Sequence, residues 1–167
     1  MISIIVCTYN RAEKLRSFLV SLAQQERLNS SVAWEIVVVD NNSSDGTRTV
    51  VDDMKKSTGL NLRYLLEKQQ GKSFAMKSGV ACAQGKILVF TDDDAIADRR
   101  WVASIHEATH KQQRIAFGGR VIPTWDHPLP AWFDFSSPYC RHFIGGAIGC
   151  HNKGDEARDY DEECGYR

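Results

Sequence analysis

Short apolar runs alternate with segments of helical periodicity along the first two-thirds of the chain. Strands are predicted at 2–6, 34–39, 60–66 and 86–90, where apolar residues cluster. Between them, apolar residues recur at helical spacing, as they do at Leu15, Phe18, Leu19 and Leu22. Further helices are predicted around 50–54, at 71–83 and at 99–112, and another strand begins at 115–117. Because alternating strands and helices need crossover connections, we predict an α/β fold with a mainly parallel sheet, flanked by helices and with strands buried on both faces.

The pattern changes after residue 121. Residues 122–139 are rich in proline and aromatic side chains and show no clear periodicity, and the acidic stretch GDEARDYDEE follows further on. We therefore predict one domain made of an α/β part, 1–121, and an irregular C-terminal segment, 122–167.

Composition narrows the class of protein. The 167 residues are 43% hydrophobic and 25% charged, which is typical of a globular domain with a real core. Lys plus Arg number 21 and Asp plus Glu number 21, so the formal net charge is zero. Such a balance supplies no general attraction for nucleic acid, and we expect no nucleic-acid partner.

Cysteine usage and the N-terminus bear on location. Five cysteines at irregular spacing favour a reducing compartment over a disulfide framework. A zinc site formed from Cys140, His142, Cys150, His151 and Cys164 is an alternative, but the chain has no closely paired cysteines. The apolar run at 2–6 is too short for a signal peptide, and no run could span a bilayer. We expect a cytoplasmic protein, either free or at the inner face of the membrane.

Polar residues gather where three of the predicted strands end. The first strand ends in Thr8-Tyr9-Asn10-Arg11, the second in Asp40-Asn41-Asn42-Ser43 and the fourth in Asp92-Asp93-Asp94. In open α/β sheets, ligands bind beyond the carboxyl ends of the strands. We therefore expect these three ends to face one cleft.

The three consecutive aspartates require a counter-charge. If extended geometry continued past Phe90, Asp92 and Asp94 would share a face and Asp93 would point the opposite way. Two converging carboxylates raise each other's pKa unless a cation neutralises them, and Mg²⁺ or Mn²⁺ fits such oxygen ligands. The alternative is that the aspartates are solvated and cap the next helix, although Asp98 is better placed to do so. Asp45 is predicted to cap the helix that carries Val50.

Motifs that are absent exclude several nucleotide-binding folds. The chain has no G-x-G-x-x-G after the first strand and no G-x-x-x-x-G-K-[ST] anywhere. A phosphoacceptor receiver domain needs acidic residues after the first strand, where this chain has Thr8-Tyr9-Asn10.

Four segments together resemble the family 2 glycosyltransferases, which have the GT-A fold. They are IIVCTYNR (4–11), IVVVDNNSSDGT (36–47), GKSFAMKSGVACAQGKILVFTDDD (71–94), and Trp101 followed by GGRVIPTW (118–125). The resemblance implies that 1–121 binds a nucleotide-sugar donor and that 122–167 holds an acceptor-side loop and an incomplete C-terminal segment, as in a shortened member of the family. It also implies nucleotide-binding roles for Thr8, Tyr9, Asn10, Arg11, Asp40, Lys72, Asp92 and Asp93, and places a divalent cation, Mn²⁺ or Mg²⁺, on Asp94 and Asp92.

The activity implied by this resemblance is metal-dependent transfer of a hexose from a nucleoside-diphosphate sugar, with UDP-sugars favoured, to a hydroxyl of a saccharide or lipid-linked acceptor. The expected mechanism is inverting, and the expected context is polysaccharide or glycoconjugate biosynthesis. Met76 and Lys77 depart from the family pattern, and no acidic residue matches the family's general base, so the catalytic base stays unassigned. The alternatives are a catalytically silent nucleotide-sugar-binding module that needs a partner chain, and a nucleotidyltransferase. The latter is disfavoured because TYNR is not a glycine- and basic-rich loop.

Overall fold

A computed structural model describes residues 1–26, 32–111, 116, 118, 119, 121 and 128. The chain divides into two compact units, Met1–Gln113 and Arg114–Arg167, and every described helix and strand lies in the first. In chain order these elements are β1 (Ile2–Thr8), α1 (Ala12–Ala23), β2 (Trp34–Asp40), α2 (Thr47–Thr58), β3 (Leu62–Leu66), α3 (Lys72–Cys82), β4 (Ile87–Asp92) and α4 (Trp101–Lys111). The four strands and four helices predicted before residue 113 are confirmed. The strand predicted at 115–117, most of the segment 122–167 and the residues considered for zinc lie outside the described residues.

The four described strands form one parallel sheet in the order β3-β2-β1-β4. The register aligns Thr8 with Asp40 across β1 and β2, and Cys7 with Asp92 across β1 and β4. The predicted parallel sheet is therefore confirmed, and the polar ends of three strands meet at one edge of it.

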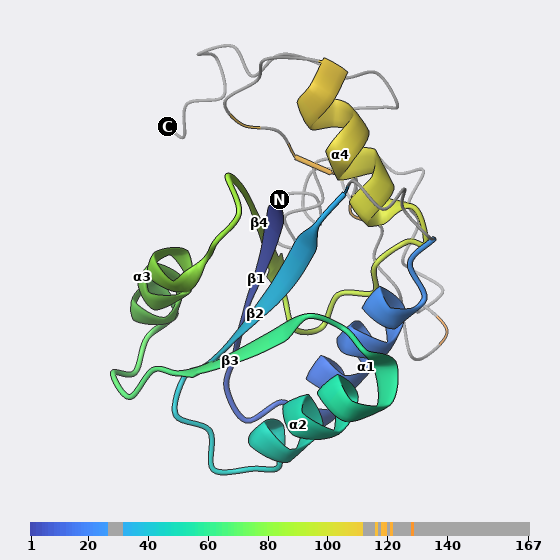
Figure 1. Cartoon of the computed structure of the whole chain (residues 1–167). Coiled ribbons are helices and arrows are strands. Elements are labelled where there is room, and N and C mark those ends of the chain that lie inside the picture. Colours follow the sequence, from blue (N-terminus) through green and yellow to red (C-terminus); the bar gives the residue numbers. More distant parts are fainter. Residues whose placement is uncertain (27–31, 112–115, 117, 120, 122–127, 129–167) are drawn as a thin grey trace. The chain divides into compact units, whose positions relative to one another are not determined.

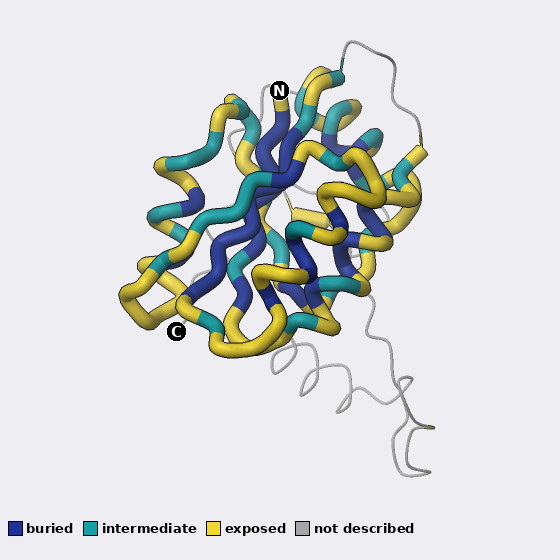
Figure 2. The backbone as a smooth tube through the Cα atoms, turned by 60° about the horizontal axis from the view of Figure 1, so that its bottom comes forward, coloured by how far each residue is buried: buried dark blue, intermediate teal, exposed yellow. Residues whose placement is uncertain are grey.

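Helices cover both faces of the sheet (Figure 1). On one face, α1, α2 and α4 pack against the main hydrophobic core, which includes Ile4, Val6, Phe18, Leu19 and Val102. This face receives the apolar stripe of α1, because Leu15, Phe18, Leu19 and Leu22 recur at helical spacing and are all buried. Figure 2 shows that the central strands are the most continuously buried part of this unit.

Among the described elements, only α3 covers the other face. A smaller core of Ile5, Val37, Val39 and Ala75 lies there. Gly79 lets α3 approach the sheet closely, since a Cβ at this position would lie 2.6 Å from Ile5 Cγ2. None of the described helices is long and apolar enough to cross a membrane.

β4 departs from the prediction that strands are buried on both faces. Its residues Val89 and Ile87 pack against the main core, but on the α3 side Phe90 remains 49% exposed. The physical reason is position: β4 is the last strand of the described sheet, while α3 packs over β1 and β2. An uninterrupted apolar run therefore did not distinguish a central strand from this one.

Candidate functional site

The loops after β1 and β2 are tied together by Asn10. Its Oδ1 accepts a hydrogen bond from the Ser44 backbone N–H at 2.8 Å, and its own N–H donates to Ser43 Oγ at 2.9 Å. Asn10 has a φ of 51°, a left-handed conformation that asparagine tolerates better than most residues. The contacts indicate that Asn10 shapes the loop, while the adjacent Tyr9 is exposed.

Asp45 stabilises the starts of two helices. Its Oδ2 accepts from the Ala12 N–H at 3.0 Å, and its Oδ1 accepts from the Thr47 N–H at 3.0 Å. Burial acts to raise the pKa of Asp45, but the hydrogen bonds from Thr47 and Ala12 outweigh it, so the pKa lies below its ordinary value. The N-cap residue of α2 is Gly46, so Asp45 lies one residue before the predicted cap position, and its carboxylate accepts the first N–H of both α1 and α2.

Asp40 is enclosed, with only 2% of the residue exposed. Its Oδ1 accepts from the Ser43 N–H at 2.8 Å, and its Oδ2 accepts from the Tyr64 hydroxyl at 2.7 Å. Burial, together with the hydrogen bond to Asp40, raises the pKa of Tyr64 to about 12. A carboxylate has roughly four lone-pair sites, and Ser43 and Tyr64 each use one on Asp40. The N–H of a bound nucleobase would have to use one of the sites that remain.

Tyr64 was not predicted as part of the site. The register aligns Leu66 with Asp40, and alternation along β3 places Tyr64 on the same face as Leu66. The guanidinium carbon Cζ of Arg48, on α2, lies over the Tyr64 ring at 4.2 Å from its centre. The hydrogen bond between Tyr64 and Asp40 depends on the register of β2 and β3, which the sequence alone does not supply.

The three aspartates after β4 are divided between two sets of cations. Asp92 meets Lys72, with Nζ 2.6 Å from Oδ1. Asp93 is 4% exposed; its Oδ2 accepts from Thr8 Oγ1 at 2.7 Å and its Oδ1 from Arg11 Nη1 at 3.2 Å. The expectation that Asp92 and Asp94 share a face is wrong, because β4 ends at Asp92 and the chain turns at the next two residues.

Asp94 is paired with the first turn of α1. Its Oδ2 lies 3.2 Å from Arg11 Nη1 and 4.0 Å from Lys14 Nζ. Lys14 was not predicted, although it lies one helical turn after Arg11. The hydrogen bond to Asp93 raises the pKa of Arg11, and the hydrogen bond to Asp92 raises the pKa of Lys72, so both cations stay charged at neutral pH.

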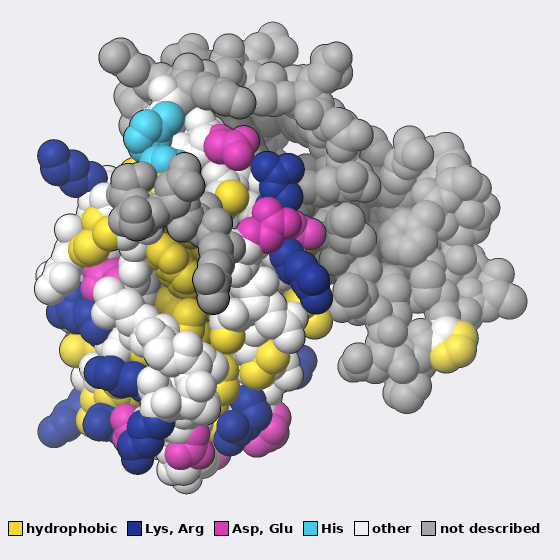
Figure 3. Space-filling model, turned by 45° about the vertical axis from the view of Figure 1, so that its right-hand side comes forward, with side chains coloured by type: hydrophobic (Ala, Val, Ile, Leu, Met, Phe, Trp, Pro, Cys, Tyr) yellow, Lys and Arg dark blue, Asp and Glu magenta, His cyan; other side chains and the backbone are white. Residues whose placement is uncertain are grey.

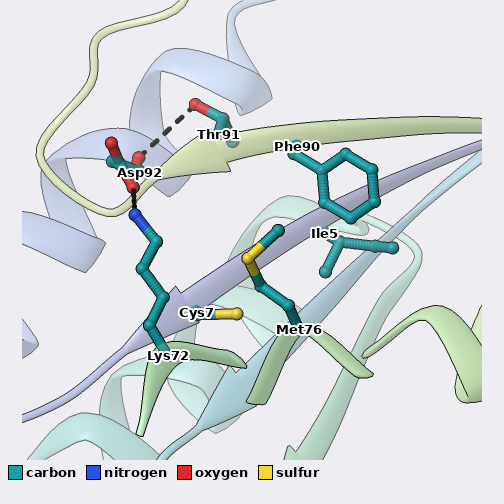
Figure 4. A pocket seen from close by; sticks show the side chains of 7 residues that line it. All are labelled: Ile5, Cys7, Lys72, Met76, Phe90, Thr91 and Asp92. Carbon is teal, nitrogen blue, oxygen red and sulfur yellow. Dashed lines mark hydrogen bonds and ion pairs between the residues drawn. The ribbon is translucent and has the colours of Figure 1, made fainter. Parts of the chain in front are cut away.

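A pocket of about 200 Å³ lies beside the Lys72–Asp92 pair (Figure 4). It is lined by Ile5, Cys7, Lys72, Met76, Phe90, Thr91 and Asp92. Figure 4 shows the ion pair at one end of the pocket and the apolar side chains of Met76, Phe90 and Ile5 at the other. Burial raises the pKa of Cys7, so the thiol at this wall stays protonated at neutral pH. Met76, a position at which the sequence departs from the pattern of the resembled family, contributes to the apolar end of the pocket together with Phe90 and Ile5.

The predicted residues thus fall into two groups at the same sheet edge. Thr8, Arg11, Asp93 and Asp94 form one connected network on the α1 side, and Asp40 lies on that face with Tyr64. Lys72 and Asp92 lie on the α3 side with the pocket. On the face drawn in Figure 3, both acidic and basic side chains are scattered over the described residues.

The residues at this edge fit a divalent cation only in part. The described residues contain no group of three or more His, Cys, Asp or Glu that could hold a metal ion. The side chains of Asp92 and Asp94 are nevertheless 63% and 43% exposed and supply carboxylate oxygens. Mg²⁺ is typically held by one or two carboxylates, with water and substrate phosphate oxygens in its other positions. Each of these two carboxylates could therefore supply one ligand to a cation whose other positions are filled by water and phosphate oxygens, although Asp92 and Asp94 belong to different groups at this edge.

The parallel sheet and its flanking helices are those of the GT-A fold, as comparison with solved structures shows. A mannosyltransferase from Pyrobaculum calidifontis, solved with GDP-Man and Mn²⁺, is 32% identical with a TM-score of 0.54, over 59% of this chain and 29% of that one. TarS from S. aureus, solved with UDP-GlcNAc, is 26% identical with a TM-score of 0.58, over 74% of this chain and 37% of that one.

The chain belongs to glycosyl transferase family 2, whose family model matches residues 3–157. The glycosyltransferase AglE of Haloferax volcanii is 33% identical over 102 residues, which cover 60% of this chain and 33% of that protein. The glucosyl-dolichyl phosphate glucuronosyltransferase of the same organism is 26% identical over 154 residues, covering 92% of this chain and 46% of that protein. The chain therefore spans less than half the length of these curated relatives.

Proposed function

We propose that this protein transfers a sugar from a nucleoside-diphosphate sugar to an acceptor hydroxyl in polysaccharide or glycoconjugate synthesis. The observation that carries the proposal is the convergence of the β1, β2 and β4 ends, with their polar side chains and a pocket, at one edge of a family 2 sheet. Similar solved structures hold GDP-Man with Mn²⁺ and UDP-GlcNAc, which supports a nucleotide-sugar donor.

The residues at this sheet edge have different proposed roles in binding the nucleotide-sugar donor. The exposed ring of Tyr9 can stack on a base, and Asp40 can accept a base N–H while Tyr64 holds its other oxygen. Lys72 offers positive charge to the diphosphate. Thr8 and Arg11 hold the buried Asp93, and Asn10 fixes the adjoining loop, so these residues position the site. UDP is the favoured nucleotide.

Asp94 and Asp92 are the proposed cation ligands. A bound Mn²⁺ or Mg²⁺ would stabilise the negative charge that develops on the departing diphosphate. For an inverting transfer, the acceptor hydroxyl attacks the anomeric carbon on the face opposite the diphosphate, and a base removes its proton. None of the described carboxylates is assigned as this base, so the residues that complete catalysis stay unassigned.

The proposed acceptor is a saccharide or a lipid-linked sugar, which would place the reaction at the cytoplasmic face of a membrane. The names of two relatives support a lipid-linked acceptor: the dolichyl-phosphate β-glucosyltransferase of Dictyostelium discoideum and the GalNAc(5)-diNAcBac-PP-undecaprenol β-1,3-glucosyltransferase of Campylobacter jejuni.

Calorimetric titration tests the donor site. UDP, GDP and dTDP are each titrated with and without Mn²⁺ into the natural chain, Asp94→Ala and Asp53→Ala. Asp53 is an exposed aspartate on α2 and serves as the matched control. We expect one nucleotide to bind with Mn²⁺, at least tenfold more weakly to Asp94→Ala, a loss of about 1.4 kcal/mol in binding free energy, and unchanged to Asp53→Ala.

Absence of binding by every nucleotide would contradict the proposal. If a nucleotide binds, an assay of sugar transfer and donor hydrolysis then separates the enzyme from a module that binds nucleotide sugars without turnover.

A further inference from the structure

The carboxylates at the end of β4 are already balanced by cations of the same chain. Asp92, Asp93 and Asp94 are the three acidic groups, and Lys72, Arg11 and Lys14 are the three basic ones within 4.0 Å of them. These six side chains therefore carry no net charge before any ligand arrives, while the neighbouring carboxylates Asp40 and Asp45 are held by hydrogen bonds.

Neutrality has a consequence for the two proposed ligands. A divalent cation alone would bring excess positive charge to three basic side chains, and the dianionic diphosphate of a nucleotide sugar alone would bring excess negative charge to three carboxylates. The cation and the diphosphate together restore neutrality, so the site favours the pair over either ligand alone.

The Lys72–Asp92 pair is the contact best placed to change partners. Both side chains are more than half exposed, at 66% and 63%, and they come from different elements, α3 and β4. They meet at one end of the pocket, where Lys72 Nζ occupies an oxygen of Asp92 that a cation would need (Figure 4). Asp93 differs, because it is buried beneath Thr8 and Arg11 and has no comparable freedom.

We propose that the Lys72–Asp92 ion pair exchanges partners when the donor binds, with Asp92 turning to the divalent cation and Lys72 to the diphosphate, so that the two ligands bind cooperatively. The inference rests on the proposed function. Each ligand releases the group that the other one needs, and by thermodynamic linkage the coupling is the same in both directions.

The size of the effect follows from the exposure of the pair. Exposed ion pairs contribute about 0.2–1 kcal/mol, so releasing one should change the affinity of a single ligand by up to about fivefold. A deeply buried pair would give a larger effect, but neither side chain here is buried.

Binding of each ligand alone, and of both together, tests the exchange. Mn²⁺ binding is followed by the electron paramagnetic resonance signal of the free ion, and UDP and GDP binding by calorimetry. The natural chain is compared with Lys72→Met, Asp92→Asn and Lys77→Met. Lys77 is an exposed lysine of the same helix with no ion pair among the described residues, so Lys77→Met controls for a general loss of positive charge.

In Lys72→Met we expect Mn²⁺ alone to bind about two- to fivefold more tightly, because Asp92 is released. In Asp92→Asn we expect nucleotide without metal to bind more tightly by a similar factor, because Lys72 is released. In both variants the factor by which Mn²⁺ improves nucleotide binding should fall relative to the natural chain and to Lys77→Met.

The exchange is overturned if Lys72→Met leaves Mn²⁺ affinity unchanged or lowers it, or if Lys77→Met raises that affinity equally. The Mn²⁺ measurements use no nucleotide, so they decide the exchange at Asp92 even if no nucleotide binds. Failure of nucleotide binding in the natural chain would instead overturn the proposed function.

Discussion

At the scale of the residue, Glu35 is a carboxylate enclosed at the opposite end of the sheet from the candidate site. It is fully buried; its Oε1 accepts from Ser3 Oγ at 2.6 Å and from the Gln84 N–H at 2.7 Å, and its Oε2 lies 3.1 Å from Arg63 Nη1. Burial acts to raise the pKa of Glu35, but hydrogen bonds from Ser3, Gln84 and Arg63 hold it below its ordinary value. This carboxylate therefore joins β1, β2 and β3 to the chain before β4.

Replacing Glu35 by glutamine should lower the free energy of unfolding by about 2 kcal/mol at neutral pH. The amide has one acceptor oxygen in place of two, so one of the donors that now face the carboxylate would be left without a partner. Urea unfolding measures the change, with the exposed Glu26→Gln as the matched control. A loss below about 0.5 kcal/mol, the range of ordinary surface substitutions, would contradict this account.

The same residue should make stability depend on pH in a defined direction. Because the pKa of Glu35 is lowered by folding, its contribution is fully present above the unfolded value of 4.5 and is lost as pH falls through the folded value. The stability difference between the natural chain and Glu35→Gln should therefore shrink below pH 4.5. A constant difference from neutral pH down to acid unfolding would show that the carboxylate is not responsible.

At the scale of the element, α3 is placed by how closely its backbone approaches the sheet. Ala75 and Gly79 are its buried residues, whereas Phe74 and Val80 are exposed. The helix therefore has a narrow inward face of small residues. This close approach brings Lys72, at the start of α3, within reach of Asp92.

The change Gly79→Ala tests this packing. A Cβ would lie 2.6 Å from Ile5 Cγ2 and 3.0 Å from Val39 Cγ2, both on branched core side chains. Overpacking costs about 1–3 kcal/mol and should exceed the gain of about 1 kcal/mol in helix propensity, so we expect net destabilisation in urea unfolding. Ser73→Ala, at an exposed position of α3, is the control and should change little. A more stable Gly79→Ala variant would mean that α3 lies further from β1.

At the scale of the whole molecule, the unit Met1–Gln113 has the parallel sheet and flanking helices of the GT-A fold, within a chain that spans less than half the length of its curated relatives. The formal net charge of the whole chain is zero, and the three carboxylates at the end of β4 lie within 4.0 Å of three basic side chains. Because the two proposed ligands are expected to bind cooperatively, both together should stabilise the protein more than either one alone.

We expect Mn²⁺ and the preferred nucleoside diphosphate together to raise the free energy of unfolding by about 2.7 kcal/mol at a ligand concentration one hundred times its Kd. The urea midpoint of the natural chain and of Asp53→Ala should rise, whereas that of Asp94→Ala should rise much less. Equal stabilisation of Asp94→Ala would show that Asp94 does not bind the cation.

The sequence by itself determined the order of the elements, the parallel sheet and the sheet edge where polar residues gather. These features follow from local periodicity and from the rule that ligands bind beyond the carboxyl ends of strands. It also placed Asp45 beside the start of α2, where its carboxylate accepts the Thr47 N–H, although the N-cap residue is Gly46.

Only the tertiary structure decided which side chains meet. The sequence could not show that Tyr64 takes one oxygen of Asp40, that Thr8 and Arg11 enclose Asp93, or that Lys14 joins Asp94, since each pair depends on register or on a turn. Nor could it show the exposure of Phe90, because an apolar run is the same in a central strand and in the last strand of the described sheet. Local pattern fixes secondary structure, whereas the partners of a charge are set by segments up to 85 residues apart in the chain.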